Sequence, residues 1–359
     1  MVGRFTERFS TPGARRAGTA LALALALAFP PLTAALVPDN RYYLELGFHF
    51  WQYAILGLSL NVILGGAGLY NLGHAAFYAV GAYTTGILNT KLGIPTLWLL
   101  PVAALTAALF AAVISRPILH LRGDYLLIVT VGFAEIVRIA LRNNVFGLTG
   151  GPNGILGIDR PELFGMRFNT PLHFYYLSLF FVVLTVFIAV RLERSRVGRA
   201  WNFIREDELA AESMGIDTTR YKFLAFVTGA ALAGMAGNVY AGKMTVIAPE
   251  SFSFWESVVI FAIVILGGTG SIPGIFLGTF GMVVLPQLPF LRGLQDARML
   301  VFGAAMVLMM IFRPQGLWPS RRWSLAVGRG LEEGGPAEGG PAQGGPAAPT
   351  RAAAGGGGQ

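Results

Sequence analysis

Long apolar runs follow one another between residues 18 and 314 and dominate this sequence. An α-helix needs about 20 apolar residues to cross a bilayer core of about 30 Å. Most of the runs approach that length, so the pattern predicts an all-α polytopic membrane protein with about ten transmembrane helices. The runs cover residues 21–37, 47–64, 70–89, 95–114, 125–141, 172–190, 223–242, 255–267, 272–289 and 297–312.

The positions of the basic residues predict how these runs are threaded through the membrane. Lys and Arg gather in four blocks, at residues 4–16, 116–122, 191–222 and 313–322. Such residues are enriched in cytoplasmic connections. Threading from a cytoplasmic N-terminus places every block, and both termini, on the cytoplasmic side. The loops 142–171 and 245–254 then lie outside.

The two ends of the sequence differ from its middle. The basic start followed by Leu21–Val37 resembles a signal peptide, but this run is nearer to the length of a span, so we expect a retained first helix. We therefore divide the chain into a cytoplasmic N-terminus at 1–17, a transmembrane domain at 18–314 and a tail at 323–359. The tail is rich in Gly, Pro and Ala without apolar periodicity, which predicts disorder.

Composition argues against several other classes of protein. The chain has no cysteine, which excludes disulfides and thiolate sites, and its four histidines are scattered, so we predict no metal site. The net charge of +8 would suit nucleic acid, but the basic residues lie between apolar runs, which indicates a lipid bilayer instead.

One segment, Gly237–Met244, has the spacing of a phosphate-binding loop, but Met244 replaces the Ser or Thr that would bind magnesium. Small residues recur there at every fourth position, as in a helix-packing stripe. The members of the stripe are Gly229, Ala233, Gly237 and Ala241. Without a nucleotide site or a catalytic triad, we expect no enzyme and no cofactor bound by this chain.

The cytoplasmic connection 191–222 contains the segment "REDELAAESMGI" at 205–216, which predicts a short helix with acids in its first turn and Gly215 at its end. Its mildly apolar face, made of Leu209, Ala210, Ser213 and Met214, suits a groove on a soluble partner. The alternative is a helix that lies on lipid head groups. Three successive acids on so short a helix favour the protein partner.

Two ionisable residues lie within an apolar run. Glu135 and Arg138 are three residues apart, so they share a helix face and can neutralise each other. Charged groups at membrane depth usually face an interior or a cavity. The pair therefore lines either a transport path or the interface with a second subunit. Alternatively, Arg138 extends to the head groups and Glu135 is structural.

The outer loop 143–158 carries strong turn chemistry in Gly150, Gly151, Pro152, Asn153 and Gly154. A rigid loop of this kind suits docking of an extracytoplasmic protein. The alternative is that it only reverses the chain.

Two glycine segments share the same beginning. "LGGAGLYNLGHAA" at 64–76 and "LGGTGSIPGIFLG" at 266–278 each lie between two runs at a cytoplasmic end, one in each half of the chain. The matched glycines are Gly65, Gly66 and Gly68 in the first and Gly267, Gly268 and Gly270 in the second.

Paired segments of this kind indicate two structural repeats whose broken helices surround a transport path. Asn71 and His74 are the side chains that we expect to face this path. The alternative interpretation is two ordinary glycine turns between hairpin helices.

Several longer stretches resemble one known family. They are "LGHAAFYAVGAY", "RGDYLLIVTVGFAEIVRI", "LTGGPNGILGI", "SRVGRAWNFIREDELAAESMGI" and "FRPQGLW". In this order, and over residues 53–318, they resemble the LivM-type permease of branched-chain amino acid ABC importers. The core Ala210–Gly215 is similar to the segment by which permeases of ABC importers meet their ATPases.

The resemblance implies a multi-pass subunit of the bacterial inner membrane that moves leucine, isoleucine or valine inward by alternating access. Its implied partners are a homologous second permease, two ATPase subunits that bind ATP and Mg, and an extracytoplasmic binding protein. The implied ATPase contacts are Arg205, Glu208, Ala210, Ala211, Glu212, Met214 and Gly215. Related permeases that carry urea, short amides or other amino acids are the alternative. A stand-alone secondary transporter fits less well, because few ionisable groups lie in the runs.

Overall fold

A computed structural model describes residues 12–36, 40–121, 123–163 and 165–287, with residues 303–304, 307, 311–312 and 316–318. Most of the predicted N-terminal segment 1–17, most of the predicted run 297–312 and all of the predicted tail 323–359 lie outside these residues.

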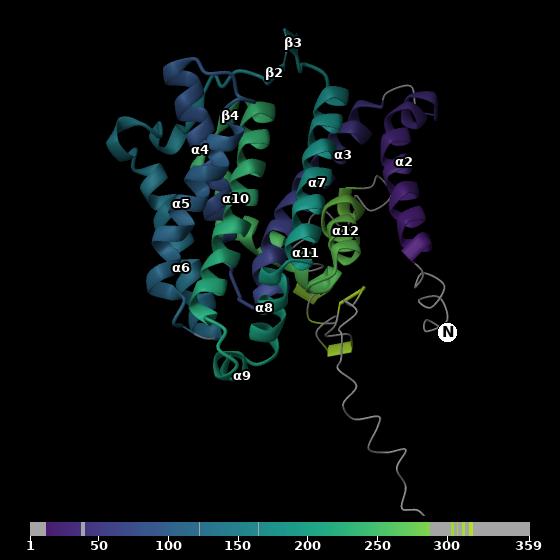
Figure 1. Ribbon diagram of the computed structural model, residues 1–359. Coiled ribbons are helices and arrows are strands. Elements are labelled where there is room, and N and C mark those ends of the chain that lie inside the picture. The colour runs from purple at the N-terminus through teal and green to yellow at the C-terminus, as the bar shows by residue number, and fades with distance from the viewer. Residues whose placement is uncertain are drawn as a thin grey trace, which may run out of the picture. The chain divides into compact units, whose positions relative to one another are not determined.

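Helices follow the predicted apolar runs in order along the chain (Figure 1). They are α2 Pro12–Leu36, α3 Arg41–Asn61, α4 His74–Leu92, α5 Leu100–Ile118, α6 Asp124–Arg142, α7 Pro171–Glu193, α8 Arg196–Glu206, α9 Glu208–Ser213, α10 Thr218–Met244, α11 Phe254–Gly267 and α12 Ile272–Thr279. π-Helical turns extend α3 over Val62–Gly66 and α12 over Phe280–Val284, and a 3-10 turn Leu285–Gln287 follows. The prediction of a mostly helical fold is confirmed.

Within the described residues, 5 helices are long and apolar enough to cross a membrane. They are Arg41–Gly66, Leu100–Ile118, Pro171–Glu193, Thr218–Met244 and Pro249–Gly267. Shorter apolar helical stretches cover Leu23–Ala35 and Ile272–Gln287.

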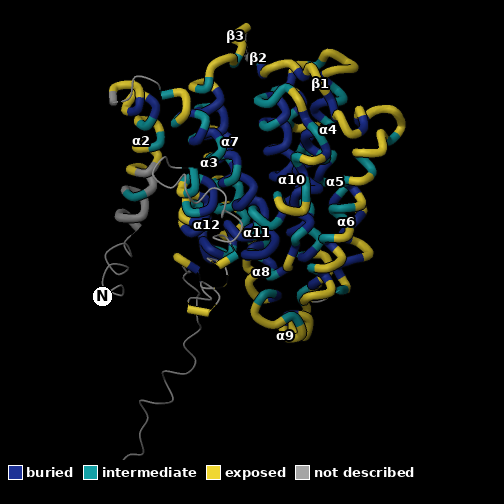
Figure 2. The backbone as a smooth tube through the Cα atoms, turned by 180° about the vertical axis from the view of Figure 1, so that it is seen from behind, coloured by how far each residue is buried: buried dark blue, intermediate teal, exposed yellow. Residues whose placement is uncertain are grey.

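Small residues allow α10 to lie close against its neighbours. A side chain on Gly237 would collide with the backbone of Tyr78 and Ala82 in α4, and one on Gly234 would meet Ala107 in α5. Helices come this close only where small residues meet. The predicted packing role of the stripe that contains Gly237 is confirmed. Figure 2 shows α10 and α3 among the most deeply buried parts of the chain.

The two loops that the sequence places outside pair with each other. Strand β1, Ile155–Leu156, lies antiparallel to β4, Val246–Ile247, while β2, Glu162–Leu163, forms a hairpin with β3, Met166–Arg167. The 3-10 turns of these loops are η2 Val145–Gly147, η3 Gly151–Asn153 and η4 Pro249–Phe252. We call the end of the bundle formed by the loops 142–171 and 245–254 the loop end. Two-residue strands carry no periodicity, so the pairing was invisible in the sequence.

Helices α8 and α9 lie at the opposite end (Figure 1). The prediction of one helix over 205–216 is wrong at its start: α8 continues to Glu206, and α9 begins at Glu208. Asp207 separates them because its backbone is extended and its side chain accepts hydrogen bonds from the N–H groups of Leu209 and Ala210. The predicted end is correct, since Gly215 has a φ of +80° and closes α9.

Both glycine segments interrupt helices at this α8–α9 end. The first leaves residues 68–73 outside regular helix, before α4 begins at His74. The second joins α11 to α12, which pack together where Gly267, Gly274 and Gly278 leave no room for a side chain. This second segment is therefore the tight connection of a helical hairpin.

Candidate functional site

The two glycine segments touch each other. Asn61 Oδ1 accepts a hydrogen bond from the backbone N–H of Gly270 at 2.8 Å. A side chain on Gly65 would collide with both of these groups. The segments therefore meet through backbone that only glycine leaves accessible. We call residues 65–68 and 267–270 together the glycine junction.

One side chain from α8 ties the glycine junction together. Arg205 donates from Nη1 to the carbonyl oxygen of Gly65 and from Nη2 to Thr269 Oγ1 at 3.1 Å. The Cα and side-chain stem of Arg205 lie against Gly68, whose φ is +72°. A planar guanidinium suits this task, because its donors are held in a fixed fork. The family resemblance implied that Arg205 contacts an ATPase, whereas its head group points inward to the glycine junction.

Trp201 packs α8 against the glycine junction. Its indole is buried, lies against Gly66 and donates from Nε1 to the carbonyl oxygen of Tyr221 at 2.7 Å. Leu317 and Trp318 add backbone bonds to Leu266 and Gly267. Sequence reasoning missed Asn61, Trp201 and Thr269. Two of them could have been noticed in the sequence. Asn61 is a polar amide within the apolar run 47–64, and Trp201 is a large aromatic residue within the basic connection 191–222.

Helix α9 has one side tied to the start of α10. Lys222 Nζ lies 2.6 Å from Glu208 Oε1, and only 4% of the Lys222 side chain is exposed. Thr218 Oγ1 donates to Glu212 Oε1 at 2.7 Å, and Ala211 is buried. These contacts fix the orientation of α9.

The opposite side of α9 is free of the bundle. Leu209 is 61% exposed and Met214 is 74% exposed. Ala210, Ser213 and Gly215 are exposed beside them. The mildly apolar face expected from the sequence is therefore present. Phe203 of α8, which is 45% exposed, extends it and was not predicted.

Asn71 and His74 lie inside the subunit, next to the first glycine segment. His74 is fully buried, and its Nε2 lies 2.7 Å from Ser59 Oγ. Because Ser59 Oγ donates to the Leu56 carbonyl, it accepts from His74. Among the described residues, Asn71 Nδ2 and His74 Nδ1 have no hydrogen-bond partner.

The irregular backbone around Asn71 and His74 is covered by neighbouring helices. The N–H of Leu72 donates to Thr130 Oγ1 of α6, and the N–H of Ala75 donates to Ser257 Oγ of α11. Non-helical backbone in a membrane protein needs such cover by protein.

Glu135 and Arg138 form the predicted ion pair, with Arg138 Nε at 3.0 Å from Glu135 Oε2. Arg138 Nη1 also donates to Glu250 of the loop 245–254 at 2.9 Å. This pair lies toward the loop end of α6, with Glu135 about 7.5 Å and Arg138 about 12 Å along the helix from Thr130, which contacts the first glycine segment. The structure therefore does not bring it together with the glycine junction.

The predicted docking loop is folded back onto the bundle. Asn144 Oδ1 accepts from the N–H groups of Thr149 and Gly150 at 3.2 and 3.0 Å. The backbone of Gly154 lies against that of Ile247 and Ala248. Gly151 is buried within η3, which leaves Pro152 and Asn153 exposed at the tip.

Within the described ranges, no three His, Asp or Glu side chains gather closely enough to hold a metal ion.

Comparison with known proteins places the sequence in one family. The sequence model of the family described as "Branched-chain amino acid transport system / permease component" matches residues 42–310. The "High-affinity branched-chain amino acid transport system permease protein LivM" of Escherichia coli K12 is 42% identical over 87% of this chain and 77% of its own length.

More distant relatives match as well. The LivH permease protein of Salmonella typhimurium is 29% identical over 74% of this chain and 90% of its own length. The probable LivM permease protein of Methanocaldococcus jannaschii is 24% identical over 76% of this chain and 92% of its own length. No solved structure matches this chain.

The resemblance inferred from the sequence motifs is therefore confirmed, and the chain belongs to the permease-component family of branched-chain amino acid transport systems.

Proposed function

We propose that this chain is one of two permease subunits of an ATP-driven importer for branched-chain amino acids, and that it forms half of the translocation path. The observation that carries this proposal is the 42% identity to a LivM permease protein over 87% of the chain. The 29% identity to a LivH permease protein supports a homologous second permease as its partner.

In this proposal the α8–α9 end is cytoplasmic and meets one of two ATPase subunits, which bind ATP and Mg. The exposed apolar face around Leu209 and Met214 supports this assignment, because such a face fits a groove on a soluble partner. ATP hydrolysis then belongs to the partner subunits, and this chain is not itself an enzyme. The loop end faces an extracytoplasmic binding protein, with Pro152 and Asn153 at the tip of the docking loop.

The proposed complete subunit has about ten helices in two repeats, lies in the inner membrane and keeps both termini in the cytoplasm. The contact between the two glycine segments supports the repeats, since matched interruptions in two halves often meet around a transport path. Arg205 links that contact to α8, so a movement of α8–α9 is carried to both segments at once.

Alternating access then follows from a shift of the two segments against each other. Glu135 and Arg138, placed toward the loop end, belong in this proposal to the outer part of the path or to the interface with the second permease.

Uptake by the reconstituted complex tests the substrate. The full complex of two permeases, two ATPases and the binding protein is placed in proteoliposomes with ATP inside. We expect ATP-dependent accumulation of leucine, isoleucine and valine. Accumulation of urea or a short amide without any leucine uptake would overturn the substrate, and no ATP dependence would overturn the class of transporter.

A further inference from the structure

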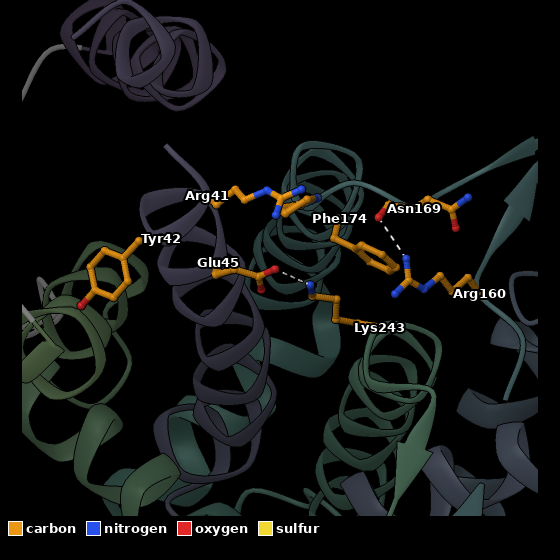
Figure 3. A pocket seen from close by; sticks show the side chains of 8 residues that line it. Arg41, Tyr42, Glu45, Arg160, Asn169, Phe174 and Lys243 are labelled. Carbon is orange, nitrogen blue, oxygen red and sulfur yellow. Dashed lines mark hydrogen bonds and ion pairs between the residues drawn. The ribbon is translucent and has the colours of Figure 1, made fainter. Parts of the chain in front are cut away.

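A cavity of about 410 Å³ opens at the loop end, between α3, α7 and α10 (Figure 3). Its walls come from the first turns of α3 and α7, the last turn of α10 and the loop that carries Arg160. A cavity of this volume is large enough for a small ligand. None of the residues predicted from the sequence as functional lines it.

The floor of the cavity places an aromatic ring beside an ion pair. Lys243 Nζ lies 2.7 Å from Glu45 Oε1, and only 14% of the Lys243 side chain is exposed. The same Nζ lies 4.9 Å from the ring centroid of Phe174, which is itself buried. The ring and the ion pair hold one another in place, so the floor is preformed.

The rim of the cavity is cationic. Arg41 and Arg160 lie on either side of Phe174 in Figure 3. Arg160 uses Nη1 to donate to the carbonyl oxygen of Asn169 at 3.0 Å, which orients its guanidinium. A guanidinium has five N–H donors, so this bond leaves others for a ligand.

Arg160 and Lys243 line the cavity against one carboxylate, that of Glu45, and Arg41 lies at the rim beside them. A concave site with an excess of one charge concentrates ions of the opposite charge. Arginine in particular recognises the two oxygens of a carboxylate. The combination of cationic rim, single carboxylate and apolar ring matches a small molecule with a carboxylate, an ammonium and an apolar group.

We propose that this cavity is an outer binding site for a free α-amino acid with an apolar side chain. The α-carboxylate binds Arg160 at the rim, the ammonium lies toward Glu45, and the apolar side chain points toward the α7 wall formed by Pro171 and Phe174. This inference relies on the proposed function, which supplies such an amino acid from the loop end.

Direct binding to the assembled complex tests the site. The two permeases and two ATPases, without the binding protein, are placed in phosphatidylcholine nanodiscs and titrated with L-leucine and with L-leucinol, which lacks the carboxylate. We expect leucine to bind and leucinol to bind at least about tenfold more weakly. R160Q weakens leucine binding by about tenfold or more, and R160K restores part of it.

R167Q is the matched control, because Arg167 belongs to the same loop, pairs with Glu162 and does not line the cavity. We expect R167Q to bind leucine as the unmodified complex does. Equal leucine binding by R160Q and R167Q would overturn the proposal, as would no leucine binding by the unmodified complex.

A lipid phosphate has similar oxyanion chemistry, so the titration is repeated in phosphatidylglycerol nanodiscs. Equal leucine affinity in the two lipids is expected. Loss of leucine binding in phosphatidylglycerol, with R160Q lowering retention of that lipid, assigns the cavity to lipid and overturns the proposal. Leucine uptake by the same complex with its binding protein is measured alongside. Uptake without leucine binding in the cavity defeats only this inference, whereas absence of uptake defeats the proposed function.

Discussion

Arg205 connects α8 to both glycine segments. Its guanidinium bonds Gly65 and Thr269, which belong to different halves of the chain, while its own backbone belongs to α8. Its role is therefore to position the glycine junction relative to α8.

Replacing Arg205 tests that positioning role. We expect R205Q to assemble with both ATPases but to lose most leucine uptake, because the movement of α8 no longer reaches the glycine segments. ATP hydrolysis continues and is no longer stimulated by substrate-loaded binding protein. The measurement compares uptake with ATPase rate in the same proteoliposomes. R199Q is the control, since Arg199 is exposed on the same helix. Normal leucine uptake by R205Q, with ATP hydrolysis still stimulated by the loaded binding protein, would refute the positioning role of Arg205.

Gly65 tests the contact between the two segments. G65A places a methyl group against Asn61 Oδ1 and the N–H of Gly270, so the segments must separate. Overpacking of this kind costs typically about 1–3 kcal/mol. We expect a lower midpoint of thermal unfolding and reduced uptake. G132A is the control, because a side chain at Gly132 of α6 meets open space. Unchanged stability and uptake in G65A would show that the segments do not need this contact.

At the scale of elements, α9 has two sides with different tasks. Its inner side is fixed to α10 through Lys222 and Thr218, and its outer side exposes Leu209 and Met214. A short helix held so firmly keeps its exposed face in one orientation, which a docking partner requires.

A double substitution tests α9 as the ATPase contact. L209E combined with M214E adds two charges to the exposed apolar face without touching the contacts to α10. We expect the permease pair to be purified without most of its ATPase. L156E combined with M166E is the control, because both residues are similarly exposed but lie at the loop end. Full retention of ATPase by the α9 variant would mean that the contact lies elsewhere.

The sequence predicted the elements better than their contacts. Runs of apolar residues are visible locally, and nine of the predicted runs carry helices in the described residues. The pair Glu135 and Arg138 was also visible, because three residues separate them. Their partner Glu250 is 112 residues from Arg138, and no local pattern links them.

The candidate site was predictable only in part, because contacts between residues far apart in the sequence leave no local pattern. The shared glycine pattern identified both segments, but their contact through Asn61 depends on how α3 meets the hairpin of α11 and α12. The split between α8 and α9 depends on a single capping side chain, Asp207. A propensity summed over the segment cannot resolve such a cap.

At the scale of the whole described bundle, α10 connects its two ends. Its 27 residues span about 40 Å. Lys222 near its first turn pairs with α9, and Lys243 near its last turn lies on the floor of the outer cavity. One continuous helix therefore contacts both proposed docking ends of the subunit.

The orientation of the two ends across the membrane is a further prediction. We expect a periplasm-active reporter fused after Pro171 to be active and the same reporter fused after Arg196 to be inactive, because α7 separates these positions. Reporter activity in whole cells provides the measurement. An inactive fusion after Pro171 with an active one after Arg196 would invert the proposed topology.

The glycine junction also limits how proteins of this kind can diverge. A side chain at Gly65 would meet Gly270 of the second segment, so position 65 cannot gain an atom unless the second segment retreats. A change at such a position needs a matching change in its neighbour, whereas exposed positions such as Gly132 of α6 can change singly. New substrate preferences are therefore expected to evolve first at the outer cavity, and the machinery near Arg205 to be inherited nearly intact.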